Sequence, residues 1–168
     1  MSQNSLVSIV RDLIECARMR VLQEDPTWSG RVCMNPYSTP TYDDCCNGQI
    51  QGTITRYYPF DTFPIDNDGL RPCDTGQLAA DVTIGIYDCF SGMGPRGGPK
   101  SCEDLDSATD KVTVQAAAVW QGVLCCLQEM ENVDYVFRSQ APLDNEQGGC
   151  IGTELTITIG IWSGCQCD

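Results

Sequence analysis

The sequence predicts an α+β domain in which an antiparallel sheet of about four or more strands carries two long helices on one face. Two segments show the apolar spacing of three and four residues that is typical of amphipathic helices. Four shorter segments alternate apolar and polar residues, which indicates strands with one buried face and one polar face. Because the chain has 168 residues, the usual size of one domain, we expect residues 1–168 to form a single domain.

The first helix is expected over residues 5–22. Charged residues, among them Arg11 and Arg18, occupy the side of the helix opposite an apolar stripe. The stripe consists of Leu6, Ile9, Val10, Leu13, Ile14, Ala17 and Val21. Residues 24–48 follow, and their three prolines and two glycines predict a long irregular segment.

Two strands are expected in the middle of the chain. The first covers residues 49–58 and stops at Pro59, and a turn-rich loop is predicted over 59–77. In the second strand Asp81, Thr83, Gly85 and Tyr87 alternate with an apolar face. That face consists of Leu78, Ala80, Val82, Ile84 and Ile86. A further loop is predicted over residues 90–106.

The second helix is expected to begin near Ser107, whose hydroxyl can cap it, with Asp110 in the first turn. Its stripe consists of Val112, Ala116, Val119, Val123, Leu127 and Met130. Two strands, at 133–138 and 153–162, close the chain. Residues 83–86 and 158–161 are both Thr-Ile-Gly-Ile, which we attribute to neighbouring strands with the same buried face rather than to an ancient duplication.

The charge balance is strongly acidic. The chain has 10 Lys and Arg, 23 Asp and Glu and no His, giving a formal net charge of −13. This balance disfavours a nucleic-acid clamp, which needs cations to neutralise phosphates. The absence of His removes Ser-His and Cys-His nucleophile pairs and every imidazole metal site. Positive and negative charges balance in residues 1–40, so the first helix either contacts a differently charged neighbour or is simply solvated.

The 12 cysteines do not have the spacing of a metal or redox site. No Cys-x-x-Cys is present, whereas structural zinc sites normally use two closely spaced pairs. We therefore expect no metal and no cofactor, and cysteines that are free thiols when the protein folds. Oxidation of some pairs after the protein leaves the cell stays open. No nucleophile elbow and no other catalytic set is evident, so we expect a protein that is not an enzyme.

The N-terminal sequence has no basic region followed by a long apolar run, so we do not expect a signal peptide. The apolar stretches are also shorter than the roughly 20 residues that span a bilayer. We therefore expect synthesis and folding in the cytoplasm, without membrane contact.

Short motifs marked by cysteine, glycine and proline extend over roughly residues 45–162. They are Cys46-Asn47-Gly48-Gln49-Ile50, Arg56 with Pro59, Phe63-Pro64, Leu70-Arg71-Pro72-Cys73, Ile86-Tyr87-Asp88-Cys89, Cys125-Cys126-Leu127 and Gly148-Gly149-Cys150-Ile151-Gly152. This set resembles a family of small proteins from the structural gene clusters of long-tailed phages of actinobacteria. The chain departs from the pattern in its acidic 61–69 loop and in the extra Cys165 and Cys167.

The resemblance implies a tail terminator or a closely placed neck protein. Such terminators are α+β subunits that form a six-membered ring on the head-proximal end of the tail tube, stop its growth and dock the head-completion (stopper) protein. It therefore implies a virion protein assembled in the host cytoplasm, with the tail tube protein below it. Genomic DNA would pass through the lumen, and an acidic lumen would let it slide without sticking.

A ring needs two different patches on each subunit. We expect them where sheet edges and the 24–48 and 61–75 loops meet a neighbour, with basic residues of the first helix and loop aromatics as anchors. The candidate interface residues are Arg11, Arg18, Arg20, Trp28, Tyr37, Tyr42, Tyr57, Tyr58, Phe60 and Phe63. Packing of each aromatic residue onto its own core is the alternative.

Three other functions remain open at this point. A head-to-tail adaptor or stopper protein would share the acidic balance and the lack of a catalytic set. A small enzyme that uses its cysteines for metal or redox chemistry is less favoured. A carbohydrate- or receptor-binding module would use the aromatic loops.

Overall fold

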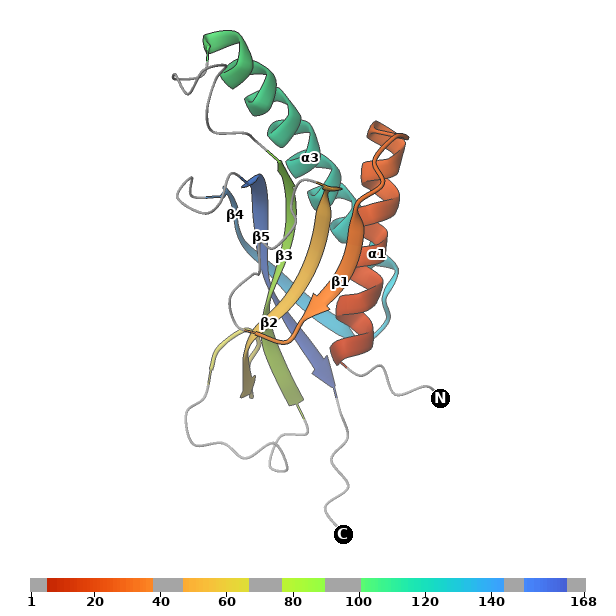
Figure 1. Ribbon diagram of the computed structural model, residues 1–168. Coiled ribbons are helices and arrows are strands. Elements are labelled where there is room, and N and C mark those ends of the chain that lie inside the picture. The colour runs from red at the N-terminus through yellow and green to blue at the C-terminus, as the bar shows by residue number, and fades with distance from the viewer. Residues whose placement is uncertain (1–5, 38–46, 67–76, 90–100, 144–149, 163–168) are drawn as a thin grey trace.

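The computed structural model describes residues 6–37, 47–66, 77–89, 101–143 and 150–162. Its elements are α1 (Leu6–Glu24), β1 (Arg31–Asn35), β2 (Gln49–Pro59), β3 (Gln77–Cys89), α3 (Cys102–Glu129), β4 (Val133–Pro142) and β5 (Cys150–Trp162). The strands form one sheet in the order β1-β2-β3-β5-β4 (Figure 1). The predicted α+β class with two helices is confirmed.

The sheet is mixed, because β1 runs parallel to β2 while every other neighbouring pair is antiparallel. The prediction of a purely antiparallel sheet is therefore wrong, and β1 lies inside the segment 24–48 that was predicted to be irregular. The strand escaped prediction because it is only five residues long and sits between Gly30 and Pro36. Val32 and Met34 are the two residues of β1 that pack against the core. An alternation of two apolar residues is too short to identify a strand.

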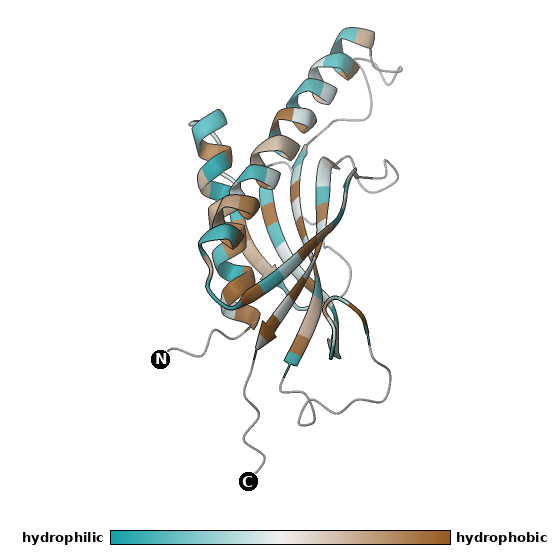
Figure 2. Ribbon diagram, turned by 180° about the vertical axis from the view of Figure 1, so that it is seen from behind, coloured by the Kyte–Doolittle hydropathy of each residue, from teal (hydrophilic) through white to brown (hydrophobic). Residues whose placement is uncertain are grey.

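Both helices pack on the same face of the sheet, as predicted (Figure 1 and Figure 2). α1 contacts β1 and β2, and α3 contacts mainly β5. All seven apolar residues of the predicted α1 stripe are buried. In α3, Val119, Val123 and Leu127 of the predicted stripe are buried, whereas Val112 and Ala116 are only partly covered.

The longest strand pairing joins β3 to β5, from Gln77 opposite Trp162 to Cys89 opposite Cys150. Its apolar face lies under the helices and forms the centre of the core. The buried side chains of this face are Ala80, Val82, Ile84, Ile86, Leu155, Ile157, Ile159 and Ile161. The two Thr-Ile-Gly-Ile segments therefore belong to neighbouring strands, as expected.

α3 begins earlier than predicted. Ser101 is its N-cap, and it forms a capping box in which the Ser101 hydroxyl accepts from the Asp104 backbone N–H. The predicted start near Ser107 is wrong because the first buried residue of α3 is Gln115, so core periodicity does not mark the preceding turns. Figure 1 shows this first half of the helix extending beyond the strands. Of the predicted loop 90–106, residues 101–106 are thus cap and helix, and 90–100 lie outside the described residues.

The two helices are held together by a close crossing and a disulfide. A Cβ atom on Gly122 would lie 2.6 Å from the carbonyl oxygen of Cys16 and 2.9 Å from the Cα atom of Ala17. One turn further, Cys126 is bonded to Cys16 across 110 residues of sequence, with a Cα–Cα distance of 6.2 Å. Sequence spacing gave no sign of this pair because the two cysteines meet only when the helices pack.

The expectation of free cysteines is therefore wrong for Cys16 and Cys126. It is also wrong for Cys89 and Cys150, which are disulfide-bonded as well. Within the described part of the chain, Cys33, Cys102 and Cys125 are free thiols.

We predict that Gly122→Ala lowers the free energy of unfolding by about 1–3 kcal/mol, because the added methyl group meets backbone atoms of α1 that cannot rotate away. Urea unfolding of the disulfide-bonded protein measures the effect. Gln121→Ala, at the exposed neighbouring position, is the control and should change the stability by less than about 0.5 kcal/mol. A Gly122→Ala protein as stable as the wild type would contradict the close crossing.

Candidate functional site

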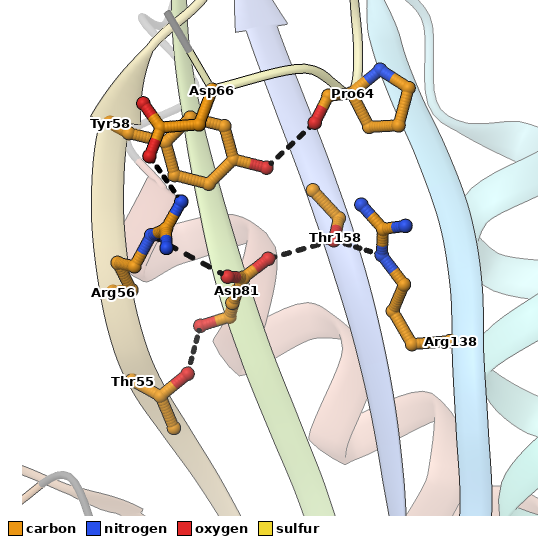
Figure 3. Close-up of polar contacts among 8 residues, drawn as sticks. All are labelled: Thr55, Arg56, Tyr58, Pro64, Asp66, Asp81, Arg138 and Thr158. Atoms are coloured by element: carbon orange, nitrogen blue, oxygen red, sulfur yellow. Dashed lines mark hydrogen bonds and ion pairs between the residues drawn. The ribbon is translucent and has the colours of Figure 1, made fainter. Parts of the chain in front are cut away.

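The sheet face that no helix covers carries a polar network of eight residues (Figure 3). The network comprises Thr55, Arg56, Tyr58, Pro64, Asp66, Asp81, Arg138 and Thr158. Its members come from β2, β3, β4, β5 and the turn after β2, so it links four adjacent strands on their outer side.

Asp81 lies at the centre of the polar network. Its Oδ1 accepts a hydrogen bond from the Thr158 hydroxyl at 2.8 Å, and the same hydroxyl accepts one from Nε of Arg138 at 2.9 Å. Thr158 is fully buried. Its hydroxyl therefore relays the attraction between a carboxylate on β3 and a guanidinium on β4, and both of its hydrogen-bonding roles are satisfied.

Arg56 connects the network to the turn after β2. Its guanidinium forms an ion pair with Asp66, and its Nε lies 3.9 Å from Oδ2 of Asp81. It also lies over the ring of Tyr58, 4.7 Å from the centroid, which is a cation–π contact. Positive and negative charges thus alternate along the network, from Arg138 through Asp81 and Arg56 to Asp66.

Two irregularities in the strand register bring side chains into this network. The register of β2 against β3 shifts between Ile54 and Arg56, and that of β4 against β5 shifts between Phe137 and Ser139. The residues left out of the pairing are Thr55 and Arg138. Thr55 donates to the Asp81 carbonyl oxygen at 3.0 Å, and Arg138 donates to Thr158. Each bulge therefore redirects one polar side chain, a frequent role of β-bulges.

Tyr58 covers the end of the network that lies next to a small apolar cluster. Its ring packs with Phe60, Ala79 and Phe63, and its hydroxyl donates to the Pro64 carbonyl oxygen at 3.2 Å. Burial raises the pKa of Tyr58, and the nearby negative charge of Asp81 raises it further. The phenol therefore stays a neutral hydrogen-bond donor across the physiological range.

An apolar groove lies on the β4 side of the molecule, where the first half of α3 departs from the sheet. We call it the α3–β4 groove. It has a volume of about 640 Å³ and is lined by Leu105, Ala108, Thr109, Val112, Thr113, Ala116, Gln140, Ala141, Pro142, Leu143, Ile151, Gly152 and Thr153. At its inner end the Gln140 side-chain amide donates to the Ala116 carbonyl oxygen at 2.8 Å.

The opposite side of the molecule carries three arginines, one of them paired with Glu15. Residues 7, 11, 14 and 18 of α1 share one helical face. Ile14, on this face, lies against β2, since a Cβ atom added to Gly52 would be 2.9 Å from the Cγ2 atom of Ile14. Cys16, on a different face, is bonded to α3. Val7, Arg11 and Arg18 are therefore on the side of α1 that is directed toward the sheet edge at β1. We call Val7, Arg11 and Arg18, with Arg31 at the start of β1, the α1–β1 surface.

The structure places the candidate interface residues in different surroundings. Arg11, Tyr37 and Tyr57 are exposed, and Arg18 and Arg20 form ion pairs with Glu15 at 2.5 Å and Glu24 at 2.9 Å.

Trp28, Tyr58 and Phe60 are buried, at 8%, 5% and 1% exposure, so these three pack onto their own core. Phe63 is half-buried against Phe60, with ring centroids 5.4 Å apart. Tyr42 lies outside the described residues.

Of the polar network, the sequence indicated only Tyr58 as a candidate site residue, with Arg56 and Pro64 present in the motifs, and it did not reveal the α3–β4 groove. Asp81 and Thr158 were visible as polar residues in alternating strands, but their pairing depends on register. Arg138 was placed at the end of a strand, because a bulge has no sequence signature here. The groove was hidden because the first turns of α3 were assigned to a loop.

The described residues contain no group of three or more Cys, Asp or Glu side chains placed to hold a metal ion. Within those same ranges, neither helix combines the length and the apolar character that crossing a bilayer requires.

Removing the relay hydroxyl should destabilise the protein. We expect Thr158→Val to lower the free energy of unfolding by about 1–3 kcal/mol, because it leaves Asp81 Oδ1 and Arg138 Nε without this partner while preserving side-chain shape. Thr156→Val is the matched control on the same strand, since Thr156 makes no side-chain hydrogen bond within the described ranges. Equal effects of the two substitutions, measured by urea unfolding, would show that the relay contributes nothing.

The phenol of Tyr58 should make the protein sensitive to alkali. A folded-state pKa above the unfolded value of about 10 stabilises the protein below pH 10, and this stabilisation is lost as the pH rises further. Tyr58→Phe should lower stability by about 1 kcal/mol at pH 7 and reduce the additional loss above pH 10. The control is Tyr57→Phe, at an exposed neighbour, which should retain the alkaline loss of the wild type. Chemical unfolding at pH 7 to 11 provides the measurement.

No known protein-family model matches this sequence, and no curated protein matches it.

Proposed function

We propose that the protein is a structural subunit of a long-tailed phage particle that forms a ring at the head-proximal end of the tail tube, as a tail terminator does. In this role it ends polymerisation of the tube, docks the head-completion protein and leaves a passage for DNA. The proposal starts from the motif resemblance described above. Several of those motifs lie at strand ends, with Gln49 and Ile50 opening β2, Asp88 and Cys89 ending β3, and Cys150 opening β5.

The observation that carries the proposal is the chemical difference between the two sides of the molecule. β1 and β4 are the two edges of the described sheet. The β1 side carries the arginines of the α1–β1 surface, whereas the β4 side carries the α3–β4 groove and the acidic first half of α3. Unlike patches on opposite sides suit a head-to-tail contact, and such contacts close into a ring when the rotation between copies is suitable.

The uncovered sheet face supports a role as a contact or lining surface. Arg56 is neutralised by Asp66 and Asp81, and Asp81 is also linked to Arg138 through Thr158. Such internally balanced charges do not provide the unpaired cations that bind phosphates tightly. This face is therefore compatible with DNA that passes through a ring without being held.

The first test is the assembly state of the purified full-length chain. We expect native mass spectrometry and negative-stain electron microscopy to show closed rings of one stoichiometry, six copies if the family resemblance holds. A chain that stays monomeric at concentrations of tens of micromolar, alone and with tail tubes added, would contradict the proposal.

The second test distinguishes two positions in the particle. In a phage that carries this gene, deletion should produce overlong tails without heads, because nothing stops the tube. Tails of normal length beside heads that leak DNA would instead identify a head-to-tail adaptor or stopper.

A further inference from the structure

We propose that the α3–β4 groove of one copy receives the α1–β1 surface of the next copy. This inference rests on the proposed ring and names the contact from which it is built. The groove is the receiving side, and the outward face of α1 with its two arginines is the inserted side.

The first half of α3 presents an apolar stripe that its own core does not cover. Leu105, Ala108, Val112 and Ala116 follow one another at spacings of three and four residues, so they share one side of the helix. Leu105 remains 47% exposed. An amphipathic helix normally buries such a stripe against another element, and a stripe that lines an open groove indicates a partner surface.

Charge decides which surface of a second copy fits the groove. Of the four acidic residues in this half of the helix, Asp104 and Asp106 flank the apolar stripe, one on each side, whereas Glu103 and Asp110 lie on the opposite side, where Asp110 lines a hollow against α1. The only basic residue in this half of α3, Lys111, is paired with Asp88 at 2.5 Å. A symmetric contact between two such helices would bring Asp104 and Asp106 of one copy close to those of the other. Repulsion between like charges disfavours that arrangement.

The α1–β1 surface has the complementary character. Arg11 is exposed and makes no ion pair within the described ranges, and Arg18 is held only by the exposed Glu15, a contact that is weak in water. Val7, 39% exposed, shares their helical face and provides an apolar side chain for the groove. One contact can thus combine apolar burial with attraction between Arg11 or Arg18 and the carboxylates that flank the groove, Asp104 and Asp106.

The edge of β4 itself is poorly suited to pair with another strand. A bulge interrupts its register at Phe137 and Ser139, and the strand ends at Pro142, which has no backbone N–H. Bulges and prolines are the usual means by which edge strands avoid pairing with other chains. The contact on this side is therefore expected to be made by side chains in the groove above β4 rather than by strand addition.

The apolar part of the contact is tested by Leu105→Glu, with Val114→Glu as the matched control. Both residues are exposed apolar positions on α3, and nine residues place them on opposite sides of the helix. We expect Leu105→Glu to weaken association at least tenfold in native mass spectrometry and analytical ultracentrifugation. Val114→Glu should assemble as the wild type does, and urea unfolding of both variants verifies that they fold.

The results separate this inference from the ring proposal. If wild-type rings form and Leu105→Glu assembles equally well, the groove is not the contact, although the ring proposal stands. A wild-type dimer that Leu105→Glu dissociates would also overturn the inference, because it would indicate a symmetric contact through the groove. A wild type that never assembles overturns both proposals.

The charged part is tested by Arg11→Gln, with Gln23→Glu as control. Each substitution lowers the net charge by one, but Gln23 lines the surface between α1 and α3 rather than the side at β1. Arg11→Gln should weaken association several-fold at low salt and less at high salt, because ions screen exposed charges. Equal effects of the two variants would show that only total charge matters and would overturn the assignment of the α1–β1 surface.

Discussion

The structure depends on the burial of one face of the β3–β5 pair beneath the two helices. Side chains such as Val82, Ile84, Ile157 and Ile159 are fully buried at the centre of the core. Because side chains alternate along a strand, burying this face forces Asp81 and Thr158 onto the other face. The polar network on the uncovered face is thus a direct consequence of how the core is built, and its hydrogen bonds compensate the burial of Thr158.

The placement of the helices makes the two sides of the molecule different. α1 lies over β1 and β2, and α3 lies over the β5 side of the sheet (Figure 1). Only the second half of α3 packs on the core, so the first half extends beyond the strands and leaves the α3–β4 groove open. The close crossing at Gly122 and the Cys16–Cys126 disulfide join that helix to α1. The groove and the α1–β1 surface are therefore positioned relative to each other through the same packed pair of helices.

These features together are the basis of the proposed contact between protein surfaces. The polar network engages its charges internally, and the apolar α3–β4 groove lies beside an acidic helix. The opposite side of the molecule carries the arginines of the α1–β1 surface, which is the proposed partner of the groove. This pairing of unlike surfaces is what connects the resemblance to ring-forming tail proteins with the geometry of the single chain.

The sequence by itself predicted the α+β class, both helices, the four longer strands and the buried faces of β3 and β5. These features follow from local periodicity, which the chain carries in consecutive residues. Only the tertiary structure decided the parallel placement of β1, the early start of α3, the Cys16–Cys126 pair and the grouping of Asp81, Thr158 and Arg138. Each depends on strand register, bulges or helix packing, which bring together residues far apart in the chain. Some candidate anchors are exposed, namely Arg11, Tyr37 and Tyr57, and others are buried, namely Trp28 and Phe60. The sequence could not distinguish the two sets, because the burial of a side chain is set by what the rest of the fold places over it.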